Sequence, residues 1–129
     1  MAIRPYKLSI VSSHPIQYQA PLFRALAAQP EIDLEVLFCS QWGMTDYHDP
    51  GFDTTFSWDI PLLEGYRYRF LRNIGIRSGR STMLSMINPG IISTISRSRV
   101  DAILVSGWAL LTNWLTATVG PLRDVPLLL

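Results

Sequence analysis

The sequence has little cysteine, few charges and no long apolar run, and each shortage excludes a class of protein. Its single cysteine, Cys39, cannot form an internal disulfide, which is typical of a reducing cytoplasm. No apolar run reaches the roughly 18 residues that a membrane-spanning helix needs. The formal net charge of +1 gives no overall attraction to nucleic acid. We therefore expect a cytoplasmic protein with no nucleic-acid partner.

Several motifs that carry chemistry are also absent. No Gly-x-Gly-x-x-Gly fingerprint follows the first predicted strand, and there is no Asp-x-Asp pair, cysteine cluster or Gly-x-Ser-x-Gly elbow. Ser13 precedes His14 directly, but neighbours on an extended chain point to opposite sides. We therefore do not expect these two residues to form a nucleophile–base pair. The sequence predicts no bound metal and no resident cofactor.

What is present indicates one folded α/β domain over residues 1–129. Hydrophobic residues make up 48% of the chain and charged residues 16%, so a disordered tail is excluded. The pattern of apolar and turn-forming residues predicts strands that alternate with helices. The expected strands are 7–13, 32–40, 66–72, 101–106 and 125–129, with an extended segment at 56–63. The expected helices are 19–29, 89–97 and 109–119.

Details of these elements give further expectations. In helix 19–29 the residues Leu22, Ala25, Leu26 and Gln29 follow the helical repeat. Asn88 is expected to cap helix 89–97, and Gly120-Pro121 is expected to end the third helix. Segment 41–53 is expected to be a loop. Segments 56–63 and 66–72 are separated by Glu64-Gly65, which makes a hairpin or a bent strand plausible.

The charges fall into two blocks of opposite sign. Residues 31–64 contain eight acids and no lysine or arginine, and residues 67–99 contain seven arginines and no acid. One interpretation is a patch for an anionic ligand or an anionic membrane surface, because arginine makes two-pronged contacts with phosphate and carboxylate. The other is that the two blocks fold against each other and neutralise. The candidate patch consists of Arg67, Arg69, Arg77 and Arg80.

Strands connected through helices predict a Rossmann-like, doubly wound and mostly parallel sheet. Ligands of such sheets bind at the carboxyl ends of the strands, near the point where the strand order reverses. The loop after the first strand and the loop after segment 101–106 should therefore share one rim. The candidate binding residues are Ser13, His14, Gln17, Tyr18, Ser106, Gly107 and Trp108.

His14 is the candidate catalytic residue of this rim. It follows a strand and precedes a helix, and an imidazole can contact a sugar hydroxyl or a phosphate, or act as a base. A second interpretation is a histidine that packs in the loop and bonds to the backbone. Gln17, Tyr18 and Gln19 add neutral donors and acceptors that suit hydroxyl-rich ligands. Trp108 is either a stacking platform for a sugar ring or a part of the core.

Segment SSHPIQYQAPLFRALA (12–27), followed by IDLEVLFCSQWG (32–43), resembles the N-terminal, acceptor-side domain of family 4-like glycosyltransferases of the GT-B fold. The closest likeness is to the bacterial branch whose first loop reads His-Pro-Ile-Gln-Tyr. Segment DAILVSGW (101–108), the predicted helix after it and VPLLL (125–129) also resemble that domain. Two features depart from the family: many relatives carry Gly-Gly in the first loop, and many carry a histidine where this chain has Ser106-Gly107-Trp108.

The resemblance implies a hexosyltransferase with two Rossmann-like halves and a cleft between them. The N-terminal half would take a glycan or lipid-linked acceptor, as in polysaccharide biosynthesis. The other half would bind the nucleotide sugar through a Glu-x7-Glu motif, and the reaction usually retains configuration without metal. His14, Gln17 and Tyr18 would line one wall of the cleft, and Ser106, Gly107 and Trp108 the other. Acceptors held at the inner membrane leaflet would place the protein peripherally on that face.

The chain ends within an apolar strand, from which we expect a truncated domain that lacks the donor half and does not transfer sugar alone. The oligomeric state stays open. Two other functions remain as alternatives. One is a stand-alone Rossmann-like module that binds a nucleotide or a protein partner without catalysis. The other is a hydrolase or isomerase on the same fold, although that chemistry would need acids that the rim loops lack.

Overall fold

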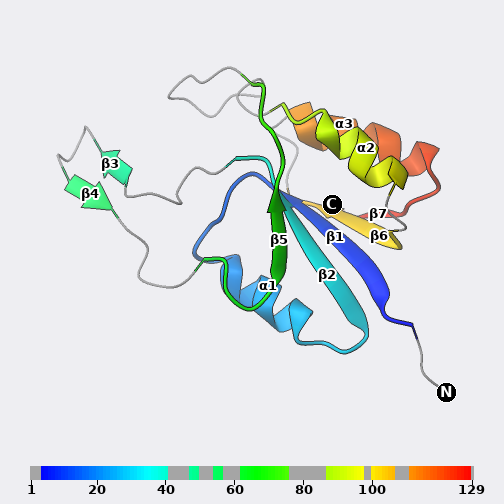
Figure 1. The fold of residues 1–129 in the computed structure, drawn as a ribbon, viewed down its shortest axis with the longest axis horizontal. Coiled ribbons are helices and arrows are strands. Elements are labelled where there is room, and N and C mark those ends of the chain that lie inside the picture. The colour runs from blue at the N-terminus through cyan, green and yellow to red at the C-terminus, as the bar shows by residue number, and fades with distance from the viewer. Residues whose placement is uncertain are drawn as a thin grey trace.

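A parallel five-stranded sheet forms the centre of the molecule (Figure 1). The computed structural model describes residues 4–40, 47–49, 54–56, 62–75, 87–97, 100–106 and 111–128. The strands of this sheet are β1 (Tyr6–Ser12), β2 (Ile32–Phe38), β5 (Arg67–Phe70), β6 (Ala102–Val105) and β7 (Leu127–Leu128). The helices are α1 (Ala20–Ala27), α2 (Gly90–Arg97) and α3 (Leu111–Leu122). A separate two-stranded sheet consists of β3 (Tyr47–Asp49) and β4 (Thr54–Phe56).

The strand order β5-β2-β1-β6-β7 confirms the predicted Rossmann-like sheet. All four neighbouring pairs of strands are parallel. β1 lies in the middle, where Ile10 pairs with Val36 of β2 on one side and with Leu104 of β6 on the other. The chain moves outward from β1 in one direction through β2 and β5, and in the other through β6 and β7. The reversal between these directions lies at the carboxyl ends of β1 and β6.

Helix α1 covers one face of the sheet and packs on an apolar cluster there. Phe23 is the largest buried side chain of α1, and it contacts the ring of Phe38 in β2 and the edge of Tyr66. Leu22 is 52% exposed, so the predicted apolar stripe through Leu22 and Ala25 is wrong. The helix is instead oriented by Phe23 and Leu26, because a phenylalanine gains more than a leucine from burial.

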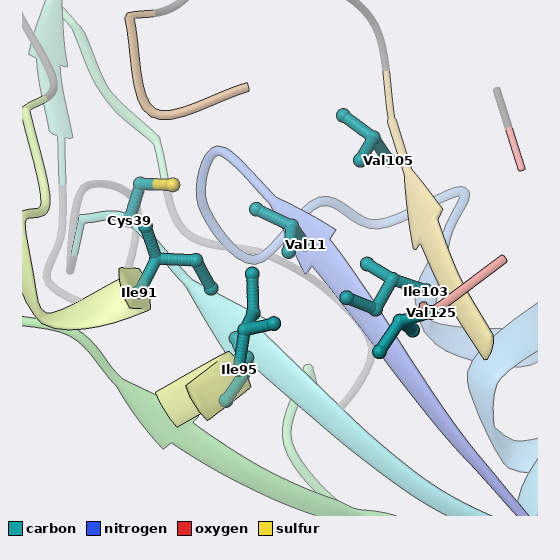
Figure 2. Close-up of a cluster of buried hydrophobic side chains, with 8 residues drawn as sticks. Val11, Cys39, Ile91, Ile95, Ile103, Val105 and Val125 are labelled. Atoms are coloured by element: carbon teal, nitrogen blue, oxygen red, sulfur yellow. The ribbon is translucent and has the colours of Figure 1, made fainter. Parts of the chain in front are cut away.

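Helices α2 and α3 cover the opposite face. Ile91 and Ile95 point from α2 toward Val11 of β1 and Ile103 of β6 (Figure 2). Cys39, directly after β2, belongs to the same cluster and has no exposed surface. Burial raises the pKa of its thiol to about 12, while a contact with Thr112 opposes that shift. Cys39 is therefore a packing residue of this cluster.

Strand β5 divides its side chains between the two faces as the period of two predicts. Tyr68 and Phe70 contact Phe38 on the α1 face. The neighbouring Arg67 and Arg69 lie on the other face beside acids of β2. Register explains this pairing, since Arg67 stands opposite Glu35 and Arg69 stands opposite Leu37.

The middle of the chain differs from expectation at one place. The segment expected to be loop contains β3, which pairs antiparallel with β4. β5 pairs in parallel with β2, and residues 57–61, which the hairpin or bent strand would need, lie outside the described residues. Gly65 does form a turn, with a φ of +87°. That turn leads the chain onto the edge of the main sheet, where β5 gains the apolar neighbour Phe38 that a lone hairpin would lack.

Helix α3 runs through Gly120 and Pro121, so the prediction that it ends there is wrong. Pro121 lies in the last turn and removes only one N–H from the helix. The helix ends at Leu122, and the chain turns away from it at Asp124, whose φ is +57°. The N–H groups of Asp124 and Val125 bond back to the carbonyl oxygens of Pro121 and Gly120, at 3.1 and 3.0 Å. This pair of bonds is the Schellman motif, with aspartate where glycine is usual.

Replacing Asp124 with glycine should raise the free energy of unfolding by roughly 0.5–1 kcal/mol. Glycine adopts a positive φ without the steric cost that a Cβ imposes there. Urea unfolding of the two proteins measures the difference. Asp124→Ala is the matched control and should lower stability, because alanine keeps the Cβ and tolerates a positive φ less well than aspartate does. Equal stability of the alanine and glycine variants would contradict this account.

Candidate functional site

The carboxyl ends of β1 and β6 lie side by side, as the sequence predicts. The backbone N–H of Ser106 donates to the carbonyl oxygen of Val11 at 3.0 Å, which extends the pairing to the last residue of that edge. On the other side, the N–H of Cys39 donates to the carbonyl of Ser12 at 2.9 Å. Ser12 therefore lies at the point where the strand order reverses. In sheets of this kind that point is where ligands bind.

Gln19 joins the two strand ends across this point. The hydroxyl of Ser12 donates to Gln19 Oε1 at 2.9 Å, and Gln19 Nε2 donates to the hydroxyl oxygen of Ser106 at 3.1 Å. Ser12 is buried, Gln19 is half-buried and Ser106 is exposed, so the chain of bonds runs from the interior to the surface. The sequence indicates Gln19 only as a neutral donor and acceptor beside Gln17 and Tyr18. Its role as a bridge between two strand ends depends on the fold, which brings Ser106 within reach of its amide.

Ser13 and His14 contact each other, which corrects the expectation from the sequence. Ser13 Oγ lies 2.9 Å from His14 Nδ1. The expectation assumed an extended chain, but residues 13 and 14 form a bend after β1. A bend places neighbouring side chains on the same side. A hydroxyl and an imidazole in hydrogen-bond contact are therefore present on the rim.

Burial lowers the pKa of His14 below its usual value of 6.5. Water stabilises the charged form of an imidazole more than its neutral form. The half-buried ring of His14 has lost part of this water, so its charged form is disfavoured. The imidazole is therefore neutral at pH 7. A neutral imidazole can accept a hydrogen bond or a proton from a hydroxyl group, whereas an imidazolium can only donate.

The low pKa of His14 predicts a loss of stability in acid. The unfolded chain takes up a proton at about pH 6.5, whereas the folded chain does so only at lower pH. The free energy of unfolding should therefore fall as the pH drops below 6.5, and level off below the folded-state pKa. Urea titrations from pH 7.5 to 5 should show this fall, and His14→Asn should reduce it. If the free energy of unfolding of His14→Asn falls with pH as steeply as that of the natural protein, the prediction is contradicted.

The structure locates some of the other candidate residues. Gln17 is half-buried in the turn that leads into α1, and Tyr18 is 76% exposed. Both lie in the loop after β1, as predicted. Gly107 and Trp108 lie outside the described residues. The rim as described thus consists of the loop after β1, Gln19 and Ser106.

A second polar side chain, Asn88, organises the neighbouring strand ends. It lies two residues before α2 with no exposed surface. Its Nδ2 donates to the carbonyl oxygens of Cys39, Leu71 and Arg72 at 2.9, 3.3 and 3.0 Å. The Thr112 hydroxyl donates to Asn88 Oδ1 and accepts from the Asn88 backbone N–H, both at 2.8 Å. The side chain predicted to cap α2 makes these bonds instead, so the cap prediction is wrong, and Asn88 holds the ends of β2 and β5 to α3.

Two of the four candidate patch arginines are paired with acids. Arg67 lies 3.2 Å from Asp33 and 3.5 Å from Glu35, and Arg69 lies 3.5 Å from Glu35. For these two, the blocks of opposite charge neutralise each other as the second interpretation predicts. Arg77 and Arg80 lie outside the described residues. Salt-sensitive binding to anionic liposomes stays a prediction for the patch as a whole.

An open cavity of about 480 Å³ lies at the opposite end of the sheet. It is lined by residues at the amino ends of the strands and the last turns of α2 and α3, among them Arg4, Asp101 and Arg123. Arg4 and Asp101 form an ion pair of 2.9 Å there. The cavity combines two arginines with two aspartates, so its charges favour neither anions nor cations. We therefore place the candidate site at the carboxyl ends of β1 and β6.

Within the described part of the chain, no three histidine, cysteine or acidic side chains gather where they could hold a metal ion. The helices described there include none that is long and apolar enough to cross a membrane. No family model, curated protein or solved structure matches the chain. The fold and the rim geometry are thus shown by the structure, and the glycosyltransferase resemblance rests on the chain's own residues.

Proposed function

We propose that the carboxyl ends of β1 and β6 form one wall of a crevice, and that this crevice binds the sugar acceptor of a glycosyltransferase. The observation that carries the proposal is the Gln19 bridge, which gathers polar side chains from β1, the start of α1 and the end of β6 at the switch point. The Ser13–His14 contact adds a hydroxyl and a neutral imidazole to the same loop. Neutral hydrogen-bonding groups without acids suit a hydroxyl-rich ligand.

His14 has a defined role in this proposal. A sugar acceptor attacks through a hydroxyl oxygen, and that oxygen becomes more nucleophilic as its proton is withdrawn. An imidazole that is neutral at pH 7 can take part of that proton in the transition state. The resemblance of residues 12–27 to the acceptor-side domain of family 4-like glycosyltransferases supports the same role. The nucleotide sugar is the co-substrate in this reaction, and no metal takes part.

The test is a titration of the ¹⁵N-labelled chain with the methyl glycosides of glucose, galactose and mannose, followed by NMR. At least one glycoside should shift the amide signals of residues 12–19 and 106, and leave those of residues 101 and 123 at the opposite end unchanged. Ser106→Ala should weaken that binding about tenfold, as the loss of one hydrogen bond predicts. Ser93→Ala, on the outside of α2, is the matched control and should bind like the natural chain.

Two outcomes would overturn the proposal. If no glycoside shifts the rim signals, the crevice does not bind sugar acceptors. If uridine or guanosine monophosphate shifts them and no glycoside does, the chain is a nucleotide-binding module, which is the alternative function. An anionic membrane surface is not part of this proposal, because Arg67 and Arg69 already pair with Asp33 and Glu35.

A further inference from the structure

Gln19 occupies the N-cap position of α1, but its side chain does not cap the helix. Its backbone carbonyl accepts a bond from the N–H of Phe23 at 3.0 Å, as an N-cap residue does, while the side chain makes no bond to the first turn. Serine, threonine, aspartate and asparagine are usual at this position because their short side chains reach that turn. The longer glutamine reaches across the switch point instead.

The two ends of the Gln19 amide fix the direction of both hydrogen bonds. Oε1 carries no hydrogen, so the Ser12 hydroxyl must be the donor in the inner bond. Nε2 carries two hydrogens and no free lone pair, so the Ser106 oxygen must be the acceptor in the outer bond. The hydroxyl hydrogen of Ser106 is therefore not used by Gln19. It meets no acceptor among the residues that the structure describes, and Ser106 is exposed.

We propose that Gln19 is a positioning residue that makes Ser106 a hydrogen-bond donor to the ligand, so that the crevice selects ligands with an acceptor oxygen at that place. This inference rests on the proposed function for the identity of the ligand, but not for the direction of the bonds. The second hydrogen of Gln19 Nε2 lies beside the Ser106 hydroxyl and supplies another donor. The chemistry recognised is an oxygen that accepts hydrogen bonds, in a sugar hydroxyl or ring, or in a phosphate.

Replacing the amide by a carboxylate of the same size reverses the outer bond. In Q19E both oxygens accept, so the Ser106 hydroxyl turns to donate to the carboxylate and no longer serves the ligand. Q19M has similar length but makes neither bond, which leaves the Ser106 hydroxyl free to rotate toward the ligand. A purely structural tether would be lost more fully in Q19M than in Q19E. The two variants therefore separate a directional role from a structural one.

The first experiment measures the affinity of each variant for the methyl glycoside that binds the natural chain most tightly. This probe is neutral, so the new charge does not repel it. We expect about tenfold weaker binding for S106A and for Q19E, and a loss of about two- to threefold for Q19M. Binding to Q19E that equals the natural chain, or a loss in Q19M as large as in Q19E, would overturn the inference.

A second experiment needs no ligand. NMR titration gives the pKa of the carboxyl group that Q19E introduces, and a hydroxyl that donates to the carboxylate lowers this pKa. Compared with Q19E, we expect the pKa of the Glu carboxyl group to be higher in Q19E/S106A and the same in the control Q19E/S93A. An unchanged pKa in Q19E/S106A would overturn the inference. This readout tests the contact between residue 19 and Ser106, on which the inference depends, even if no glycoside binds.

Inorganic phosphate distinguishes the two sources of the acceptor oxygen. Binding of phosphate that falls about tenfold in S106A but only about two- to threefold in Q19M, without glycoside binding, would leave the role of Gln19 intact and overturn the proposed sugar function. Glycoside binding that is weakened more in S106A and Q19E than in Q19M supports both the proposed function and the role of Gln19. Glycoside binding that is insensitive to Q19E supports the proposed function and overturns the inference.

Discussion

Replacing Asn88 with leucine should lower the free energy of unfolding by about 4 kcal/mol. The Asn88 amide donates to three backbone carbonyls, and its oxygen accepts from Thr112, in a site without exposed surface. Each buried polar group left without a partner costs roughly 1–3 kcal/mol, and leucine satisfies none of them. Urea unfolding measures the loss.

Two further variants make this prediction specific. Thr112→Ser keeps the hydroxyl that bonds to Asn88 and should cost about 1 kcal/mol for the lost methyl group. Thr112→Val removes the hydroxyl and leaves both bonds to Asn88 unmade, so it should cost more than the serine variant. Asn88→Leu with a loss below about 1 kcal/mol would show that water or rearrangement replaces these bonds, and would contradict the account.

Replacing Phe38 with alanine should lower the free energy of unfolding by roughly 3–5 kcal/mol. Phe38 has no exposed surface, and its ring lies 5.4 Å from that of Phe70 and 6.4 Å from those of Phe23 and Tyr68. Alanine would leave a cavity between α1, β2 and β5, whose aromatic rings are held by their own strands and helix and cannot all move into the space.

The controls for Phe38 separate burial from aromatic contact. Phe38→Leu fills much of the space and should cost less than half as much as Phe38→Ala. Tyr6→Ser, at the exposed start of β1, should change stability by no more than about 0.5 kcal/mol. Thermal unfolding of the three variants gives the order. A similar loss for leucine and alanine would show that the ring contacts matter more than the volume filled.

The parallel sheet and its rim could be predicted because short apolar runs and proline positions report local structure directly. The run that ends at Phe38 is buried on both faces, and Pro21 marks the first turn of α1. Once these strands are taken to be parallel, their order along the chain predicts that Ser106 lies beside the end of β1. The alternation of Arg67 and Arg69 with Tyr68 and Phe70 is likewise visible in the sequence, and it corresponds to the two faces that these side chains occupy in β5.

The errors concern residues whose environment is set by distant parts of the chain. Asn88 is an ordinary N-cap residue in sequence, and only the fold brings Cys39 and Leu71 within reach of its amide. The chain turns away from α3 at Asp124 because two backbone bonds hold this residue at a positive φ, whereas Gly120-Pro121 carries the stronger local signal. The prediction that Ser13 and His14 point apart assumed an extended chain, but β1 ends at Ser12 and these two residues form a bend.

Because Cys39 is buried, the rate at which its thiol is alkylated measures how often the protein opens. Alkylating reagents attack the thiolate, and a pKa of about 12 leaves almost none of it at pH 8. The thiol lies under α2 and α3 with no exposed surface, so a reagent reaches it only when that layer separates from the sheet. Since the chain contains no other cysteine, mass spectrometry after timed alkylation records how often the centre of the molecule opens.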